Sequence, residues 1–520
     1  MSRAQALGVL GAGWLLPLLA LATEPAWEHD AGSAIFGSPA AAVDTVFVGT
    51  HDGTLLALRI ADGTPAWTLD TDGAFDASPT VHAGSVYIQN RNGYLYAVAA
   101  ADGTVRWRAP TGEPGQVDFW DFTLSGAAVH DDLVIVGSGD GALRAHRVAD
   151  GSVAWTHPTG GPVRATPLVV DGIVYFGSFD GRFRAVDARD GSLRWSFKTV
   201  GSTYFPEGAI QGGAMHHEGV VYFGSRDYNL YALDAARGTG RWNFRTPSWV
   251  IGPPVAVDGR VFIGTSDSRA LYALDQRSGE VQWTQSTRAR VFASPVVFDG
   301  ALHFGGFDGR LYAIDPADGA PMGAFRTRGG VANDHKVYDE NGDFSEAFRA
   351  LYSSGQGLLA EQTILELGSI ASAPLAAGDT LVFGSTDGRV YTLAAGSSVV
   401  PAAAVDPNAD VLAWARDQYG ARLLEPIDVF HGDFTGDGVA DALAWVLYAS
   451  GGNSHFLDVA LFRSEAGRLV YYRSADGVFG GEPRNVVFAP GRITLTSTMP
   501  LPGEPRCCPT GAQDWTVDTN

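Results

Sequence analysis

One stretch of about 40 residues recurs along most of this 520-residue chain, and the repeat limits the folds that the sequence can adopt. Its clearest copy, residues 173–195, reads IVYFGSFDGRFRAVDARDGSLRW. Asp-Gly at 180–181 and again at 190–191 supplies the positive backbone φ that tight hairpin turns require. Each copy therefore predicts a small antiparallel meander whose last strand carries a tryptophan.

That tryptophan recurs at a nearly constant interval. Successive intervals are 40, 40, 48, 40, 47 and 41 residues, at Trp27, Trp67, Trp107, Trp155, Trp195, Trp242 and Trp283. A period near 40 with several strands in each unit is typical of a β-propeller. We expect each indole ring to pack one blade against the next.

Eight strands of the Val-Tyr-Phe-Gly-Ser type mark eight blades, beginning at residues 46, 86, 134, 174, 221, 261, 302 and 381. The two ends of the array complete each other. Trp27 has no repeat hairpin before it, and the hairpin at 381–393 has no docking tryptophan after it. The predicted fold is therefore all-β: an eight-bladed β-propeller whose N-terminal strand closes the last blade and so removes free sheet edges.

The pattern A-x-D-x-x-x-G-x-x-x-W is intact at 185–195 and at 273–283. It resembles the tryptophan-docking motif of PQQ-like, or quinoprotein-type, repeats, and the resemblance extends from about residue 24 to 395. It implies a propeller of that family. The departures from the motif are Arg59, Ala99 and Arg147 at the Asp position and Gly323 at the Trp position.

The N-terminal segment and the overall charge limit where the protein works and what it binds. Residues 1–22 combine Arg3, an apolar run and an Ala-Leu-Ala end, the pattern of a secretory signal peptide, so we expect a periplasmic or secreted protein. The alternative is an uncleaved membrane anchor. A formal net charge of −21 argues against a nucleic-acid partner, which requires clustered Lys and Arg. No apolar segment of transmembrane length follows residue 22.

Three connectors between blades are longer than the others, at 108–124, 196–212 and 326–372. All three join the last strand of one blade to the first strand of the next, so a meander places them on one face. We predict a binding face for a protein or peptide, formed by Asp118, Phe119, Trp120, Asp121, Tyr204, Phe205 and Glu207. In the alternative, these residues plug the wide mouth of the channel. A short helix over 345–352 is expected to cap it.

The repeat ends after residue 395, which gives a propeller domain of 23–395, a linker at 396–405 and a C-terminal domain of 406–520. A helix is predicted from residue 406 to 419, ending at a glycine. Alternating runs predict a small sheet at 442–448, 456–462, 468–473 and 492–497. The C-terminal domain is therefore expected to be α+β.

Two short motifs in the C-terminal domain have residue types that bind metals or form disulfides. DFTGDGVAD at 433–441 has the side-chain spacing that wraps a hard cation, and predicts a calcium site of Asp433, Thr435, Asp437 and Asp441. The alternative is an acidic turn before a strand. The only two cysteines, Cys507 and Cys508, are adjacent. In an oxidising compartment they can form a strained vicinal disulfide, and the alternatives are free thiols or an intermolecular bridge.

Two functions are compatible with the sequence. The first is a non-catalytic binding or scaffolding protein of the cell envelope. The resemblance implies it, because the chain is similar in repeat type and blade number to an outer-membrane assembly scaffold. The second is a PQQ-dependent dehydrogenase of alcohols or sugars. That family places a calcium-ligand set and a vicinal cysteine pair within the propeller, whereas Cys507 and Cys508 lie beyond it. No Ser-His-Asp order, P-loop or dinucleotide fingerprint occurs. The sequence therefore favours binding over catalysis, and calcium over PQQ as a cofactor.

Overall fold

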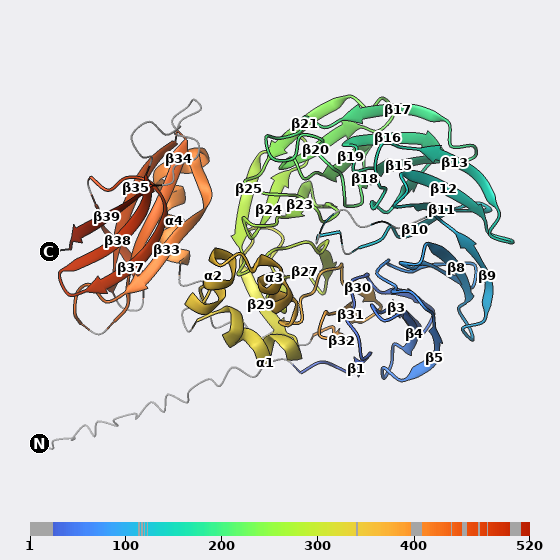
Figure 1. The fold of residues 1–520 in the computed structure, drawn as a ribbon, viewed down its shortest axis with the longest axis horizontal. Coiled ribbons are helices and arrows are strands. Elements are labelled where there is room, and N and C mark those ends of the chain that lie inside the picture. Colours follow the sequence, from blue (N-terminus) through green and yellow to red (C-terminus); the bar gives the residue numbers. More distant parts are fainter. Residues whose placement is uncertain are drawn as a thin grey trace, which may run out of the picture.

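The computed structural model describes residues 24–519, with gaps at 113–114, 116–117, 119, 122, 340–341, 397–407, 438, 450–454, 466–467, 476 and 500–510. The described residues form nine four-stranded antiparallel sheets and one three-stranded sheet. Eight of the four-stranded sheets follow one another around a ring, which is the arrangement of a β-propeller (Figure 1). The predicted signal peptide, most of the linker, Phe119, Cys507 and Cys508 lie outside the described residues.

Each sheet of the first half of the ring is a meander of four consecutive strands. The first two sheets comprise β2 (Ala40–Ala42), β3 (Thr45–Gly49), β4 (Thr54–Arg59) and β5 (Pro65–Asp70), then β6 (Thr80–His82), β7 (Ser85–Gln89), β8 (Tyr94–Ala99) and β9 (Val105–Pro110). The next two comprise β10 (Ala127–His130), β11 (Leu133–Gly137), β12 (Ala142–Arg147) and β13 (Val153–Pro158), then β14 (Leu168–Val170), β15 (Ile173–Gly177), β16 (Arg182–Asp187) and β17 (Leu193–Lys198).

The second half of the ring repeats this pattern and then closes. Three meanders comprise β18 (Met215–His217), β19 (Val220–Gly224), β20 (Asn229–Asp234) and β21 (Gly240–Arg245); β22 (Val255–Val257), β23 (Arg260–Gly264), β24 (Ala270–Asp275) and β25 (Val281–Ser286); and β26 (Val296–Phe298), β27 (Ala301–Gly305), β28 (Arg310–Ile314) and β29 (Pro321–Arg326). The last sheet takes β30 (Leu375–Ala377), β31 (Thr380–Gly384) and β32 (Arg389–Ala394) from its own repeat and β1 (Glu28–Asp30) from the N-terminus. Glu28 pairs with Tyr391 in antiparallel register, which confirms the predicted pairing of the two ends.

The repeated tryptophan packs against a glycine of the following sheet. A Cβ atom added to Gly103 would lie 2.7 Å from the indole of Trp67, too close for any side chain, and Trp67 Nε1 donates a 2.9 Å hydrogen bond to the backbone oxygen of Ala100. The other such pairs are Trp27 with Gly63, Trp107 with Gly151, Trp155 with Gly191, Trp195 with Gly238, Trp242 with Gly279 and Trp283 with Gly319. The motif therefore requires glycine, because the indole of the preceding sheet leaves no room for a Cβ atom.

The other motif residues act within one sheet. Ala185 lies directly opposite Trp195 in the pairing of β16 with β17, so a small residue faces a large one. Asp187 accepts hydrogen bonds from the Arg189 side chain and backbone, which hold the pKa of its carboxyl well below the ordinary value. The motif therefore specifies both the turn within a sheet and the contact between sheets.

The longest connector, between β29 and β30, contains three helices: α1 (Arg328–Val337), α2 (Glu346–Ser353) and α3 (Gly357–Leu365). The helix predicted at 345–352 is confirmed as α2, whose N-cap Ser345 accepts a hydrogen bond from the Phe348 backbone N–H. The sequence did not predict α1, because two glycines open it. Its N-cap Thr327 stabilises the first turn by accepting from Gly330 N.

The C-terminal residues form a separate lobe beside the ring (Figure 1). It contains α4 (Ala409–Tyr419), the 3-10 helix Gly420–Arg422, a sheet of β33 (Leu423–Gly432), β34 (Asp441–Ala449), β35 (His455–Glu465) and β36 (Arg468–Ser474), and a sheet of β37 (Gly481–Ala489), β38 (Arg492–Met499) and β39 (Gly511–Asp518). The four predicted runs correspond to β34, β35, β36 and β38. None of the helices in the described part of the chain is long and apolar enough to span a membrane.

Candidate binding face of the propeller

The three long connectors meet over the mouth of the ring. They are residues 111–126, 199–214 and 327–374, here called the first, second and third connectors. Gln211 of the second donates a 2.7 Å hydrogen bond to the backbone oxygen of Trp120 in the first. Arg290 joins the first to the third, because its guanidinium lies 4.3 Å from the centre of the Trp120 ring and pairs with Glu361 at 2.7 and 3.1 Å. The connectors therefore share one face, as their type predicts.

A buried arginine organises the junction of the first two connectors. Arg226, only 3% exposed, lies between the rings of Phe179 and Trp249, at 5.0 and 4.7 Å from their centres. Its guanidinium pairs with Asp118 at 2.5 Å and donates to Gln211 Oε1 at 2.6 and 2.9 Å. A buried cation is stable only when paired and hydrogen-bonded, so these contacts fix both connectors to the ring.

A second buried ion pair anchors the first connector. Asp121 is fully buried and accepts two hydrogen bonds from Arg164, at 2.6 and 2.8 Å. Asp76, also buried, contacts both Arg91 and His51, and its hydrogen bond with the imidazole raises the pKa of His51. The inner surface of the mouth is therefore a network of arginines and carboxylates that neutralise one another.

The seven residues predicted for the binding face divide between this network and the surface. Asp118, Trp120 and Asp121 belong to the network, and Phe205 packs edge-on against Trp249 with ring centres 4.8 Å apart. Asp121 is too buried to contact a partner, which corrects its assignment to the binding face. Tyr204 and Glu207 are exposed, and Phe119 lies outside the described residues. Asp118, Trp120 and Phe205 thus make contacts within the molecule, and a plug of the mouth stays the alternative prediction for them.

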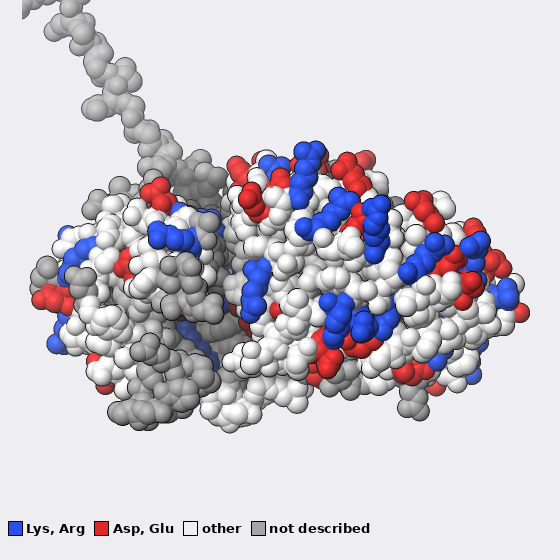
Figure 2. Space-filling view, turned by 90° about the horizontal axis from the view of Figure 1, so that it is seen from above, with Lys and Arg blue, Asp and Glu red and all other residues white. Residues whose placement is uncertain are grey.

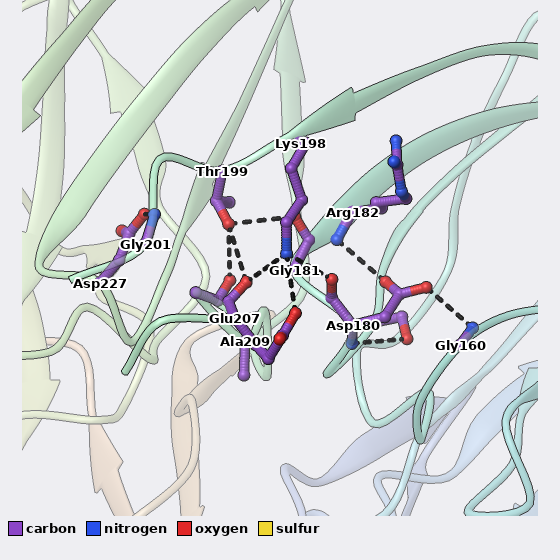
Figure 3. Close-up of polar contacts among 12 residues, drawn as sticks. Gly160, Asp180, Gly181, Arg182, Lys198, Thr199, Gly201, Glu207, Ala209 and Asp227 are labelled. Atoms are coloured by element: carbon purple, nitrogen blue, oxygen red, sulfur yellow. Dashed lines mark hydrogen bonds and ion pairs between the residues drawn. The ribbon is translucent and has the colours of Figure 1, made fainter. Parts of the chain in front are cut away.

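Hydrogen bonds hold the second connector on both sides of its exposed tip (Figure 3). Lys198 Nζ donates to the backbone oxygens of Asp180 and Glu207, at 2.8 and 2.7 Å. Gly201 N donates to Asp227 Oδ2 at 3.1 Å. A turn then places Phe205 inward and leaves Tyr204 76% exposed. The loop thus presents one large aromatic side chain on a fixed backbone.

Apolar side chains are exposed around this tip and on the helices of the third connector. They are Val200, Tyr204, Val331, Tyr352, Leu358 and Leu359. Scattered exposed apolar residues need no explanation, but a group of them on one elaborated face is typical of an interaction surface. The second and third connectors therefore each expose apolar side chains.

The sequence did not indicate Arg164 and Arg226, the propeller residues that anchor the first connector. Arg226 occupies the repeat position just before the turn aspartate, where other repeats have His51, Arg91, Phe179 and Phe307. Arg164 occupies the position two residues before the Thr-Pro or Ser-Pro pair, where others have Asp76 and Phe292. At both positions several repeats carry a charged or aromatic side chain, so a comparison of the repeats at these positions would have indicated residues that line the mouth.

The channel axis below the plug retains a cavity of about 120 Å³, bordered by Phe36, Arg164, Gln211 and Phe292. Pockets for small-molecule ligands have volumes of roughly 300 Å³ and above. Trp120 packs edge-on against Phe292, with ring centres 6.1 Å apart, and narrows the mouth further. The axial cavity is therefore smaller than such pockets.

The predicted calcium loop is closed by backbone hydrogen bonds. Asp441 is fully buried and accepts from the N–H groups of Phe434, Thr435 and Ser464 at 3.0–3.1 Å. Asp433 accepts from Gly436 N at 2.5 Å, and Asp437 accepts from Val439 N at 2.8 Å. Nowhere in the described ranges do three or more His, Cys, Asp or Glu side chains gather as a metal site. The calcium site therefore stays a prediction from the sequence.

Comparisons with known proteins agree with the repeat. The family model described as outer membrane protein assembly factor BamB matches residues 18–119, 115–206 and 203–400. No curated protein sequence matches the chain.

Solved structures of diverse proteins share the fold. One is BamB from Moraxella catarrhalis, with TM-score 0.55 and 18% identity over 71% of this chain and 98% of that one. Another is the quinohemoprotein alcohol dehydrogenase from Comamonas testosteroni, with TM-score 0.53 and 14% identity over 72% of this chain and 76% of that one. The computationally designed protein Ika8 gives TM-score 0.51 and 16% identity over 72% and 99%. At these identities the likeness shows the fold alone.

Proposed function

The chain belongs to the family described as outer membrane protein assembly factor BamB, and we propose that it is a non-catalytic binding or scaffolding protein of the cell envelope. In this proposal an eight-bladed propeller, closed by its N-terminal strand, holds a protein or peptide on the face formed by the three connectors. The C-terminal α+β domain follows as a separate unit. The signal-peptide pattern at 1–22 supports export to the periplasm or beyond.

The observation that carries the proposal is the exposed Tyr204 on its fixed loop. Binding usually loses free energy when loops and side chains become ordered, and a preorganised loop avoids most of that loss. Tyrosine supplies a large apolar area and a hydroxyl with few rotatable bonds, and it is enriched among the residues that dominate interface energies. A rigid loop that exposes such a side chain is therefore suited to recognition.

Charge limits the kind of partner. Glu207 lies beside Tyr204 with its side chain 74% exposed, and the whole chain carries a formal net charge of −21. On the side displayed in Figure 2, Lys and Arg are interspersed with Asp and Glu between wide uncharged areas. The surface therefore favours a protein partner with basic or hydrogen-bonding groups around an apolar centre over a polyanion.

The alternative function, a PQQ-dependent dehydrogenase, has support from the fold of its structural neighbours. A fold does not carry an activity with it. The small axial cavity and the plug around Trp120 argue for the binding function. An absorbance spectrum after incubation with PQQ and calcium, together with dye-coupled oxidation of an alcohol panel, would detect the dehydrogenase if this alternative were right.

Site-specific photocrosslinking tests the binding proposal. A benzophenone amino acid is placed at Tyr204 and, as a matched control, at Leu193, which is 54% exposed on β17 just before the same connector. We expect a discrete crosslinked protein in intact cells from position 204 and none from 193. Equal crosslinking at both positions, or none at 204, would contradict the proposed face.

A further inference from the structure

A second cavity lies on the connector face, between the turn that joins β23 to β24 and the helices of the third connector. Its volume is about 200 Å³. Its floor is apolar and buried, formed by Ala289, Phe307 and Ile364, and Phe344 and Tyr352 stand at its side. A space of this size admits a single side chain or a small acid, since larger ligands occupy pockets of roughly 300–1,000 Å³.

One cation at this cavity, Arg269, has no ion-pair partner among the residues that the structure describes. Arg290 is satisfied, because it pairs with Asp267 at 2.8 Å and with Glu361 at 2.7 Å. Arg269 lies 5.3 Å from the centre of the Phe344 ring. In the described part of the chain no carboxylate forms an ion pair with Arg269, although Asp343 and Asp428 are near enough to interact with it electrostatically. Its guanidinium is thus available to an anion.

The backbone at Arg269 is strained. It has φ 49°, the left-handed region that side chains other than those of glycine, asparagine and aspartate rarely adopt. Six other repeats have glycine at this turn position, namely Gly53, Gly93, Gly141, Gly181, Gly309 and Gly388. Strained residues that the surrounding structure holds in place cluster at binding sites. Here the strain is the cost of presenting a guanidinium to the cavity.

We infer that this cavity binds a carboxylate attached to an apolar group, with Arg269 pairing the carboxylate and the floor holding the apolar part. Guanidinium–carboxylate pairs are charge-assisted and frequently bidentate, so they discriminate strongly against a neutral group. This chemistry has two sources, a free small acid and the C-terminus of a polypeptide. In the second case the inference names a part of the partner and rests on the proposed function.

The test measures binding of three probes to the mature chain by calorimetry. The probes are N-acetyl-leucine, a hexapeptide that ends in leucine with a free carboxylate, and the same peptide with a C-terminal amide. We expect the free-acid probes to bind and the amide to bind at least tenfold more weakly. Tighter binding of the acid peptide than of N-acetyl-leucine assigns the site to a polypeptide terminus, and equal binding assigns it to a small acid.

Variants connect the binding to Arg269. Arg269→Gln should weaken the acid probes at least tenfold, whereas Arg182→Gln, at an exposed arginine of β16, should not. Arg269→Gly should lose binding and raise the melting temperature, because it introduces the glycine that six other repeats have at this positive φ. Tyr204→Ala should leave N-acetyl-leucine binding intact. Failure of the proposed function at Tyr204 is therefore distinguishable from failure of acid binding at Arg269. Equal binding of acid and amide, no binding of any probe, or unchanged binding by Arg269→Gln would overturn the inference.

Discussion

Trp27 Nε1 donates a 2.7 Å hydrogen bond to the backbone oxygen of Ile60, and its indole covers Gly63 so closely that a Cβ there would lie 2.5 Å from the ring. This contact joins the N-terminal strand of the last sheet to the first sheet of the ring. It has the same form as the other tryptophan–glycine contacts. The closure of the ring therefore rests on a residue that stands outside any complete repeat of the sequence.

We expect Trp27→Ala to lower the free energy of unfolding by about 3 kcal/mol, the lower end of the range for truncation of large aromatic residues, because this ring is only partly buried. Gly63→Ala should also destabilise the protein, but much less in the Trp27→Ala background, where the clash is gone. Urea unfolding of both single variants and the double variant measures this coupling. Additive losses would contradict the packing described for this pair.

Replacing one member of the buried pair between Asp121 and Arg164 should be costly. Asp121→Asn leaves a buried guanidinium without its counter-charge, which typically costs about 3–5 kcal/mol. Glu207→Gln removes an exposed ion pair with Lys198 and should cost less than about 1 kcal/mol. Chemical denaturation of the two variants gives both values. A loss at Asp121 as small as that at Glu207 would show that the first connector is not anchored by this pair.

Two buried histidines should make the propeller sensitive to acid. Burial lowers the pKa of His146 and His303, and each has a ring nitrogen without a hydrogen-bond partner among the described residues. Below the unfolded pKa of 6.5 the unfolded chain binds more protons than the folded one, so stability falls as the pH falls through 6.5. Unfolding free energies between pH 5 and pH 8 are expected to show this slope. His146→Leu should reduce it, whereas His82→Gln, at an exposed site, should not.

The acidic residues at 433–441 have two interpretations, a calcium site and a turn closed by backbone hydrogen bonds, which predict different responses to calcium. Because Asp441 already accepts three backbone hydrogen bonds, we expect Asp441→Asn to lower the melting temperature equally in calcium and in chelator. A calcium-dependent rise in melting temperature, abolished by Asp433→Asn, would instead support the calcium site predicted from the sequence. Differential scanning fluorimetry under both conditions is sufficient to distinguish them.

The sequence is informative about the fold because one physical contact recurs. The tryptophan, the glycine beneath it and the alanine opposite it each recur at a fixed position of the repeat. Their spacing is therefore enough to assign Trp27 to the closing strand. Helix α1 has no such recurring residues, and Gly329 is disfavoured in helices. A Cβ at Gly329 would lie 2.8 Å from Gly368 N, so packing requires the glycine that propensity disfavours.

The site is harder to predict because the same residue types serve a plug and an interface. Nothing in the local sequence distinguishes Trp120, whose ring packs against Arg290, from Tyr204, whose ring is exposed. The difference depends on which arginines of the ring lie beneath each connector. For the first connector, Arg226 and Arg290 come from later repeats, so the composition of that connector does not reveal them.

The central claim, that the connector face holds a protein through Tyr204, is tested most directly by affinity. The partner crosslinked at position 204 is purified, and its dissociation constant is measured for the wild-type chain, Tyr204→Ala and Leu193→Ala. Equal melting temperatures of the three proteins are the control that both variants remain folded. We predict at least a tenfold loss for Tyr204→Ala, the effect of removing a residue that dominates an interface, and no change for Leu193→Ala. Equal affinities of the wild-type chain and Tyr204→Ala would contradict the claim.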